Sequence, residues 1–381
     1  MKKIIYFLFL CLSSFILTAC FPEGEKNSNS SEEIKLDQQD GTTPEFIEEK
    51  IENNLVIKAR VVGFDHVNLK RSSISLKVFD EEKVKDIFLV DNTIIETNEV
   101  QNGFFPEYTD KYFELSDDTS LSLEMGSVTY RTPFYMNREY DSVISNATYF
   151  VRDDLESVFK ANSLEHISKE DAINQVKETA EELGIDDLGM PQVISLDLKT
   201  LEQEWEDYEM KDGSHPRQWE KDDEAYAVIF PISYDKINIT NKGYFSLNSS
   251  SGIPVIGSRI LGIVNKGGLI YMTANGIYDI GETVKEKIKP ISIEKAITKL
   301  QDKYKDTLLT DLVTISKIAL EYVPVIAENK GIEYELVPCW VFTANQEITV
   351  TDSKGTSQSS SEFSIIFNAE TGEEILIGGE Y

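Results

Sequence analysis

Strands are the first elements that the hydrophobic pattern predicts. Residues 73–78, SISLKV, alternate polar and apolar side chains, as a strand with one face in water should. Residues 121–125 and 128–132 continue this kind of pattern on either side of Gly126 and the serine that follows it, a combination that predicts a β-hairpin. The stretch from 45 to 160 is therefore expected to form a β-rich N-terminal domain.

A helical pattern occurs twice in the second half of the chain. Residues 167–173, ISKEDAI, are echoed by residues 291–297, ISIEKAI. In each copy a serine, Ser168 or Ser292, stands where an N-cap would accept a hydrogen bond from the first turn, and acidic residues follow it. Apolar positions then recur every three or four residues, so both segments are expected to be amphipathic helices with one buried stripe.

Strand-like segments follow each of these helices. After the first helix they cover residues 192–198, 224–234 and 243–248, and after the second they cover residues 317–323, 332–344 and 362–368. A further acidic helix is expected at residues 198–210. The expected fold class is therefore α+β. It consists of the β-rich domain followed by two units, residues 161–285 and 286–381, each with a helix on an antiparallel sheet.

These two units resemble the PepSY-type module. In that family a capped helix opening with Ser-x-Glu-x-Ala-Ile packs across an antiparallel sheet, which often closes with an Asn-Ala-x-Thr-Gly-Glu turn. The helix starts match at residues 167–183 and 291–304, and the closing hairpin matches within residues 332–376, which contain NAETGE. The first copy lacks this turn. The resemblance implies tandem PepSY-like units in the C-terminal half.

The start of the chain has the features of an export signal. Two lysines precede an apolar run that ends in Leu17-Thr18-Ala19-Cys20, and the run is too short for a comfortable transmembrane helix. This resembles a bacterial lipoprotein signal peptide with its lipobox. The resemblance implies that residues 1–19 are removed and that the thiol of Cys20 carries the lipid, a palmitate-type anchor. An ordinary cleaved secretory signal is the alternative.

Residues 20–44 follow as a polar stretch that is poor in aromatic residues. Because such a segment cannot bury a core, it is expected to be a disordered tether behind the lipidated cysteine. The chain as a whole resembles the uncharacterised lipoproteins of clostridial-type Gram-positive bacteria. This implies a protein that is anchored to the cell membrane and faces the outside.

The charge of the chain limits its partners. With 37 Lys and Arg against 67 Asp and Glu, the formal net charge is −30. Such a surface repels phosphate backbones, so nucleic acid is excluded as a partner. It favours solubility and could attract cations or a basic partner.

The search for catalytic and metal-binding residues gives no constellation. Of the cysteines, Cys11 leaves with the signal and Cys20 is acylated, so Cys339 remains without a partner for a disulfide. The histidines at 66, 166 and 215 lie far apart, whereas zinc ligands usually come in close pairs. Carboxylate pairs are numerous but are expected in so acidic a chain, and they could bind calcium weakly. No catalytic residue, metal or cofactor is predicted.

Aromatic residues give the remaining candidates. Trp205 and Tyr208 lie three residues apart on an acidic helix, and Trp219 follows in a polar segment. Tryptophans outside an obvious core can anchor a partner or a sugar, although they more often cover a sheet.

The sequence therefore favours a non-enzymatic, membrane-anchored binding or regulatory module for an extracytoplasmic protein or peptide. The alternative is a cell-surface hydrolase of wall polymers or glycans that uses acids in a cleft between domains. Two convergent acids with raised pKa values in a deep cleft would favour the hydrolase.

Overall fold

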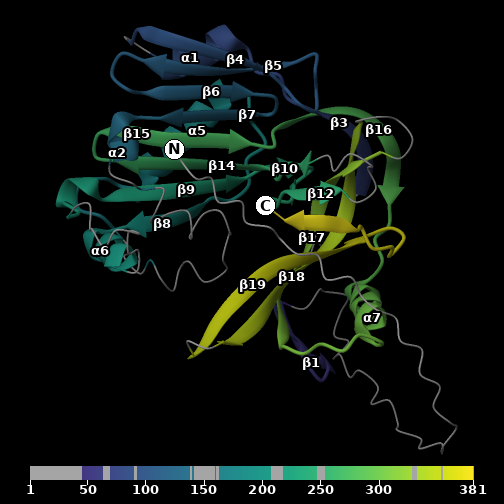
Figure 1. Ribbon diagram of the computed structural model, residues 1–381. Coiled ribbons are helices and arrows are strands. Elements are labelled where there is room, and N and C mark those ends of the chain that lie inside the picture. Colours follow the sequence, from purple (N-terminus) through teal and green to yellow (C-terminus); the bar gives the residue numbers. More distant parts are fainter. Residues whose placement is uncertain are drawn as a thin grey trace, which may run out of the picture. The chain divides into compact units, whose positions relative to one another are not determined.

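Two large β-sheets dominate the computed structural model of the protein (Figure 1). The structure describes residues 45–62, 69–89, 92–137, 140, 159, 163–206, 218–246, 254–327, 333–352 and 355–380. The expected signal peptide, the lipidated cysteine and the tether therefore lie outside the described residues. Within the described part of the chain, no helix is long and apolar enough to cross a membrane.

The eight-stranded sheet is antiparallel throughout, and Figure 1 shows its strands side by side. In spatial order they are β4 (Ile94–Gln101), β5 (Thr109–Leu115), β6 (Ser120–Glu124), β7 (Ser127–Arg131), β15 (Gly268–Asn275), β14 (Arg259–Asn265), β9 (Ala225–Pro231) and β8 (Gln192–Leu196). The hairpin predicted around Gly126 is confirmed by β6 and β7. Gly126 has a φ of 76°, a conformation that suits glycine.

The seven-stranded sheet combines strands from both ends of the chain. Its order is β1 (Phe46–Glu52), β2 (Leu55–Val62), β17 (Val313–Ile326), β18 (Tyr334–Asp352), β3 (Leu69–Leu76) and β16 (Tyr278–Ile288), while β19 (Gly355–Asn368) also pairs with β18. The β2–β17 pair is parallel, and the other pairs are antiparallel.

Short strands complete the β structure of the described residues. They are β10 (Ser233–Tyr234), β11 (Ile237–Asn238), β12 (Tyr244–Ser246), β13 (Pro254–Val255) and β20 (Ile377–Glu380). The first two form a hairpin, and the other three form a small antiparallel sheet.

The two capped helices are confirmed. They are α5 (Lys169–Glu182) and α7 (Ile293–Tyr304), and the hydroxyls of Ser168 and Ser292 accept hydrogen bonds from the backbone N–H groups three residues ahead. Helix α5 packs on β14, β15 and β9. The approach is close, because a Cβ added to Gly262 of β14 would lie 2.3 Å from a methyl carbon of Val176. The other described helices are α1 (Glu81–Phe88), α2 (Pro133–Asn137), α6 (Leu198–Glu206) and the 3-10 helix η1 (Lys221–Asp223).

The expected fold class is wrong in its organisation. The strands of residues 45–160 do not form a domain of their own, because β1–β3 belong to the seven-stranded sheet and β4–β7 to the eight-stranded sheet. The two helix-on-sheet units are also not separate copies, since both large sheets are completed by N-terminal strands. The protein is β-rich, and Thr43–Tyr381 form one compact unit. A hydrophobic pattern predicts a strand and its buried face, but it does not predict which distant strand becomes its neighbour.

One face of the eight-stranded sheet changes character from one half to the other. We call it the outer face, and it lies opposite the face that receives α5. A single row of directly paired residues on this face runs through Asn98, Tyr112, Ser122, Thr129, Thr273, Leu261 and Ile229. The row is polar over β4–β7, and we call these four strands the open half of the sheet. It becomes apolar over β14 and β9, and we call β15, β14, β9 and β8 the covered half. The main hydrophobic core includes the face of the sheet that receives α5. A second core cluster, which includes Trp219, Tyr140 and Leu201, packs on the outer face of the covered half.

The two large sheets meet at a joint of backbone hydrogen bonds. The N–H of Gly126 donates to the carbonyl of Lys77 at 2.8 Å, and Ile277 N–H donates to the Gly126 carbonyl at 3.0 Å. A second connection runs through Thr240, whose N–H donates to Tyr322 of β17 while its carbonyl accepts from Ser258 next to β14. This second connection positions the pocket described below.

Candidate functional site

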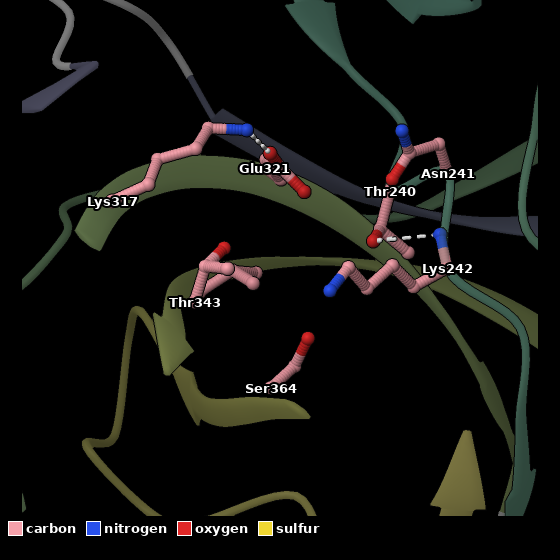
Figure 2. A pocket seen from close by; sticks show the side chains of 8 residues that line it. Thr240, Asn241, Lys242, Lys317, Glu321, Thr343 and Ser364 are labelled. Atoms are coloured by element: carbon pink, nitrogen blue, oxygen red, sulfur yellow. Dashed lines mark hydrogen bonds and ion pairs between the residues drawn. The ribbon is translucent and has the colours of Figure 1, made fainter. Parts of the chain in front are cut away.

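A small polar pocket lies where the segment after β11 crosses the seven-stranded sheet (Figure 2). It is lined by Thr240, Asn241, Lys242, Lys317, Glu321, Val341, Thr343 and Ser364. These residues come from the 240–242 segment and from the adjacent strands β17, β18 and β19. The water-accessible space within the pocket is about 30 Å³.

The strand register explains why these side chains meet. Lys317 pairs with Thr343, and Thr343 pairs with Ser364, so the three residues form one row across β17, β18 and β19. Glu321 follows Lys317 by four residues along β17 and therefore projects from the same face of the sheet. The segment that carries Thr240 runs beside β17, because the Thr240 N–H donates to the carbonyl of Tyr322 at 2.8 Å and Ile239 forms a β-bridge with Tyr322.

The charges at the pocket are balanced in two ion pairs. The Lys317 ammonium lies 3.1 Å from Oε1 of Glu321, a pair drawn in Figure 2. The Lys242 ammonium lies 2.5 Å from Oε1 of Glu362, a neighbouring residue on β19. Glu321 is buried, so its ion pair with Lys317 offsets the cost of removing the carboxylate from water.

The size of the pocket limits its chemistry. A space of about 30 Å³ accommodates roughly one or two water molecules, and hydroxyl, amide and charged groups supply the hydrogen bonds that such waters need. A sugar ring or a peptide side chain does not fit without movement of the walls. The size and the polar lining of the pocket thus suit one or two water molecules beside the seven-stranded sheet.

Of the three predicted contact residues, Trp219 is the one whose side chain the structure describes. Trp219 is 7% exposed and lies in the second core cluster, with its ring 5.2 Å from that of Tyr140 in an edge-to-face arrangement. Its indole covers the sheet, which was the alternative interpretation, and it is too deeply buried to anchor a partner. Trp205 falls in α6, but its side chain and all of Tyr208 lie outside the described residues.

Two of the other residues singled out in the sequence, Cys339 and His166, lie in the described part of the chain. Cys339 is fully buried on β18, and burial raises the pKa of its thiol far above the ordinary range, so it is an inert core residue. His166 is exposed, with Glu165 at 3.9 Å, whereas His66 and His215 lie outside the described residues. Among the described residues, no group of three His, Cys, Asp or Glu side chains could hold a metal ion.

One pair of neighbouring acids lies at the open half of the eight-stranded sheet. Burial raises the pKa of Glu124, and the charge of Asp110 raises it further. Asp110 itself is buried and accepts hydrogen bonds from the side-chain amide of Asn102, the shorter at 3.0 Å, and from Met125 N–H at 3.4 Å. Because these bonds fix the loop after β4, Asp110 has a structural role. Neither acid lines the pocket of Figure 2.

The pocket residues could have been suspected from the sequence. Residues 313–326 read VTISKIALEYVPVI, so Lys317 and Glu321 interrupt an otherwise apolar strand. Their spacing by an even number places them on one face, and opposite charges there favour an ion pair. Nothing in the sequence indicates that Thr240 and Lys242 lie against the same face.

Comparison with known proteins finds a solved structure that shares the fold of this chain. No protein-family model matches the chain, and no curated protein matches it. The crystal structure of an uncharacterized protein from Eubacterium rectale matches with a TM-score of 0.64 and 17% identity, over 88% of this chain and 94% of that one. At this identity the match shows the fold alone.

A distant structural neighbour is the C-terminal domain of YpeB from Bacillus megaterium, a PepSY-type domain. Its TM-score is 0.28 at 14% identity, and the match covers 78% of this chain and 94% of that domain. So low a TM-score supports no argument about the architecture or the function of this chain.

Proposed function

We propose that the protein is a membrane-anchored, extracytoplasmic lipoprotein of the clostridial type that binds a protein or peptide partner and catalyses no reaction. The Leu-Thr-Ala-Cys sequence that ends at Cys20 supports the lipid anchor. The net charge of −30 supports a soluble body outside the cell that does not bind nucleic acid.

The observation that carries the binding function is the nature of the polar pocket. It has room for water, and its lysines are matched by Glu321 and Glu362. An enzyme for wall polymers or glycans needs a cleft that admits a sugar ring between two acids. Because the pocket offers no such cleft, the proposal places the partner on the exposed surface of the described residues.

The anchor is tested by Cys20→Ala in the full chain, expressed in a Gram-positive host with labelled palmitate. Wild type is expected to carry the label and to sediment with membranes, whereas the variant loses the label and moves to the medium. Cys11→Ala removes a cysteine from the same signal without changing the lipobox, so it is expected to behave as wild type. If wild type stays with the membranes but has incorporated no labelled palmitate, the lipid anchor is contradicted.

The binding function is tested by cross-linking on intact cells and by incubation of the purified mature protein with isolated cell walls. The proposal expects one or a few specific cross-linked polypeptides and no released sugar or peptide. Release of wall fragments by the wild-type protein would contradict it and favour the hydrolase.

A further inference from the structure

The free edge of the eight-stranded sheet has the properties of a docking strand. Strand β4 (Ile94–Gln101) is the first strand in the order of this sheet, and among the described residues only β5 pairs with it. Every residue from 95 to 101 is exposed. Two of the exposed side chains, Ile95 and Val100, are apolar, with exposed fractions of 65% and 53%.

The register identifies the backbone groups that point away from the sheet. Residues 96–101 pair with residues 114–109, and the Asn102 N–H donates to the carbonyl of Tyr108 as the next pair in this register. In an antiparallel ladder, hydrogen-bonded and non-hydrogen-bonded pairs alternate. Residues 96, 98 and 100 therefore bond to β5, while Thr97, Glu99 and Gln101 direct their N–H and C=O groups to the outside.

The neighbouring ladder gives the same alternation. The Leu115 N–H donates to Thr119, so residues 111, 113 and 115 of β5 bond toward β6. The alternate residues of β5, 110, 112 and 114, then bond toward β4. This agrees with the register of the β4–β5 pair. Three exposed residues of β4 thus offer the backbone pattern that an added strand needs.

The charges beside this edge determine which strand it accepts. Glu96 is directly paired with Glu114, and like charges opposite each other destabilise a sheet. On the same outer face, Asp110 pairs with Val100, and Glu124 lies close enough for its pKa to be raised by Asp110. A lysine or arginine on an added strand would lie next to Glu96 and relieve its repulsion with Glu114.

A second copy of this chain does not meet this requirement. Two bodies with a net charge of −30 repel each other, and β4 carries Glu96 and Glu99 but no lysine or arginine. We propose that β4 binds an extended segment of a basic polypeptide, with lysine or arginine at alternate positions, as a ninth strand of the sheet. This inference rests on the proposed binding function and specifies the chemistry of the partner.

The test uses the full mature chain and a synthetic hexapeptide of alternating threonine and lysine with blocked ends. Binding is followed by fluorescence anisotropy, and amide hydrogen exchange locates the contact. The peptide is expected to slow exchange of the backbone amides of Thr97, Glu99 and Gln101. A hexapeptide of alternating threonine and glutamate is expected not to bind.

Thr97→Pro is the decisive variant. It removes an outward N–H that makes no bond to β5, and proline is tolerated at such edge positions. We expect it to weaken peptide binding about tenfold while the melting temperature stays close to that of wild type. Thr97→Ala keeps the N–H and is the matched control, with binding close to that of wild type. Equal binding by wild type and Thr97→Pro would overturn the proposal.

A second variant keeps the test valid if Thr97→Pro does not fold. Replacing both Glu96 and Glu114 by glutamine is expected to weaken binding several-fold and to reduce its dependence on salt. Binding that is unchanged in this double variant, or exchange slowed only outside β4, would overturn the proposal.

If Thr97→Pro still captures a partner that wild type cross-links on cells, the β4 inference fails and the binding function stands. If wild type captures none, the binding function itself fails.

Discussion

The covered half and the open half of the eight-stranded sheet share one continuous ladder of strands, yet their sequences follow different rules. Strand β9 in the covered half reads AYAVIFP, and its residues are buried on both faces except for the terminal proline. Strand β6 in the open half reads SLSLE, with leucines buried on one face and serines and Glu124 half-buried on the other. A continuous apolar run thus corresponds to a strand with two covers, and an alternating run to a strand with one.

This difference separates stability from interaction within a single sheet. The covered half is fixed by packing on both faces, with α5 on one side and the second core cluster on the other. The open half is fixed on one face and at its joint with the seven-stranded sheet. Its edge is exposed, and its outer face is half-buried or exposed apart from Asp110. Substitutions on the two halves are therefore expected to affect different properties.

The largest effect is expected for Trp219→Ala in the covered half. The substitution removes a buried indole from the second core cluster and leaves a cavity next to Tyr140. Loss of a buried aromatic side chain costs about 3–5 kcal/mol in unfolding free energy, which urea denaturation measures directly.

Tyr112→Ala is the matched variant in the open half, because Tyr112 is an aromatic residue on the outer face of the same sheet. It is expected to change the unfolding free energy by about 1 kcal/mol or less. Equal losses in both variants would mean that the open half is also held by packing on its outer face, and the distinction between the halves would be lost.

An intermediate effect is expected at the joint that holds the open half. Gly126→Ala places a Cβ at a φ of 76°, about 2.6 Å from a methyl carbon of Leu76. The left-handed conformation alone costs about 1–2 kcal/mol for a residue with a Cβ, and the contact with Leu76 adds to it. Thermal unfolding followed by calorimetry would measure the loss.

Gly103→Ala is the control for this substitution. A Cβ at Gly103 meets no atom within 4 Å, and the residue lies in the loop after β4. We expect its stability to stay within about 0.5 kcal/mol of wild type. A similar loss for both glycine variants would indicate a general effect of flexibility in the unfolded chain and not a specific joint.

The sequence predicts individual elements of this fold well and their assembly poorly. The caps at Ser168 and Ser292 and the hairpin at Gly126 depend on neighbours within a few residues, and the structure confirms all three. The turn after β19 is also local, since the Asn368 side chain accepts hydrogen bonds from the backbone N–H groups of Glu370 and Thr371. By contrast, the parallel pairing of β2 with β17 joins residues far apart in the chain. Local patterns do not specify such pairs.

The same reasoning applies to the site residues. Trp219 lies in a polar stretch of sequence, so its burial follows from distant strands and not from its neighbours. The free edge of β4 was likewise not predictable, because residues 94–101 read IIETNEVQ and give no sign of which strand ends a sheet. The identity of an edge strand is a property of the whole topology.

The smallest effect is expected for Glu124→Gln in the open half, and it depends on pH. Burial, followed by the charge of Asp110, raises the pKa of Glu124 above its ordinary value of 4.5, although Arg131 opposes the shift. A carboxyl group with a raised pKa in the folded state contributes stability below its unfolded pKa and loses that contribution as pH rises through the folded value. Glutamine stays neutral, so the variant is expected to be slightly more stable than wild type at pH 7, and this gain should vanish below about pH 4.

Urea denaturation across this range measures the difference. The control is Glu107→Gln, which removes an exposed carboxylate from the loop after β4. A gain of the same size at pH 4 and pH 7 would show that ionisation of Glu124 does not lower the free energy of unfolding. The outer face around Glu124 would then be as well solvated as the rest of the open half.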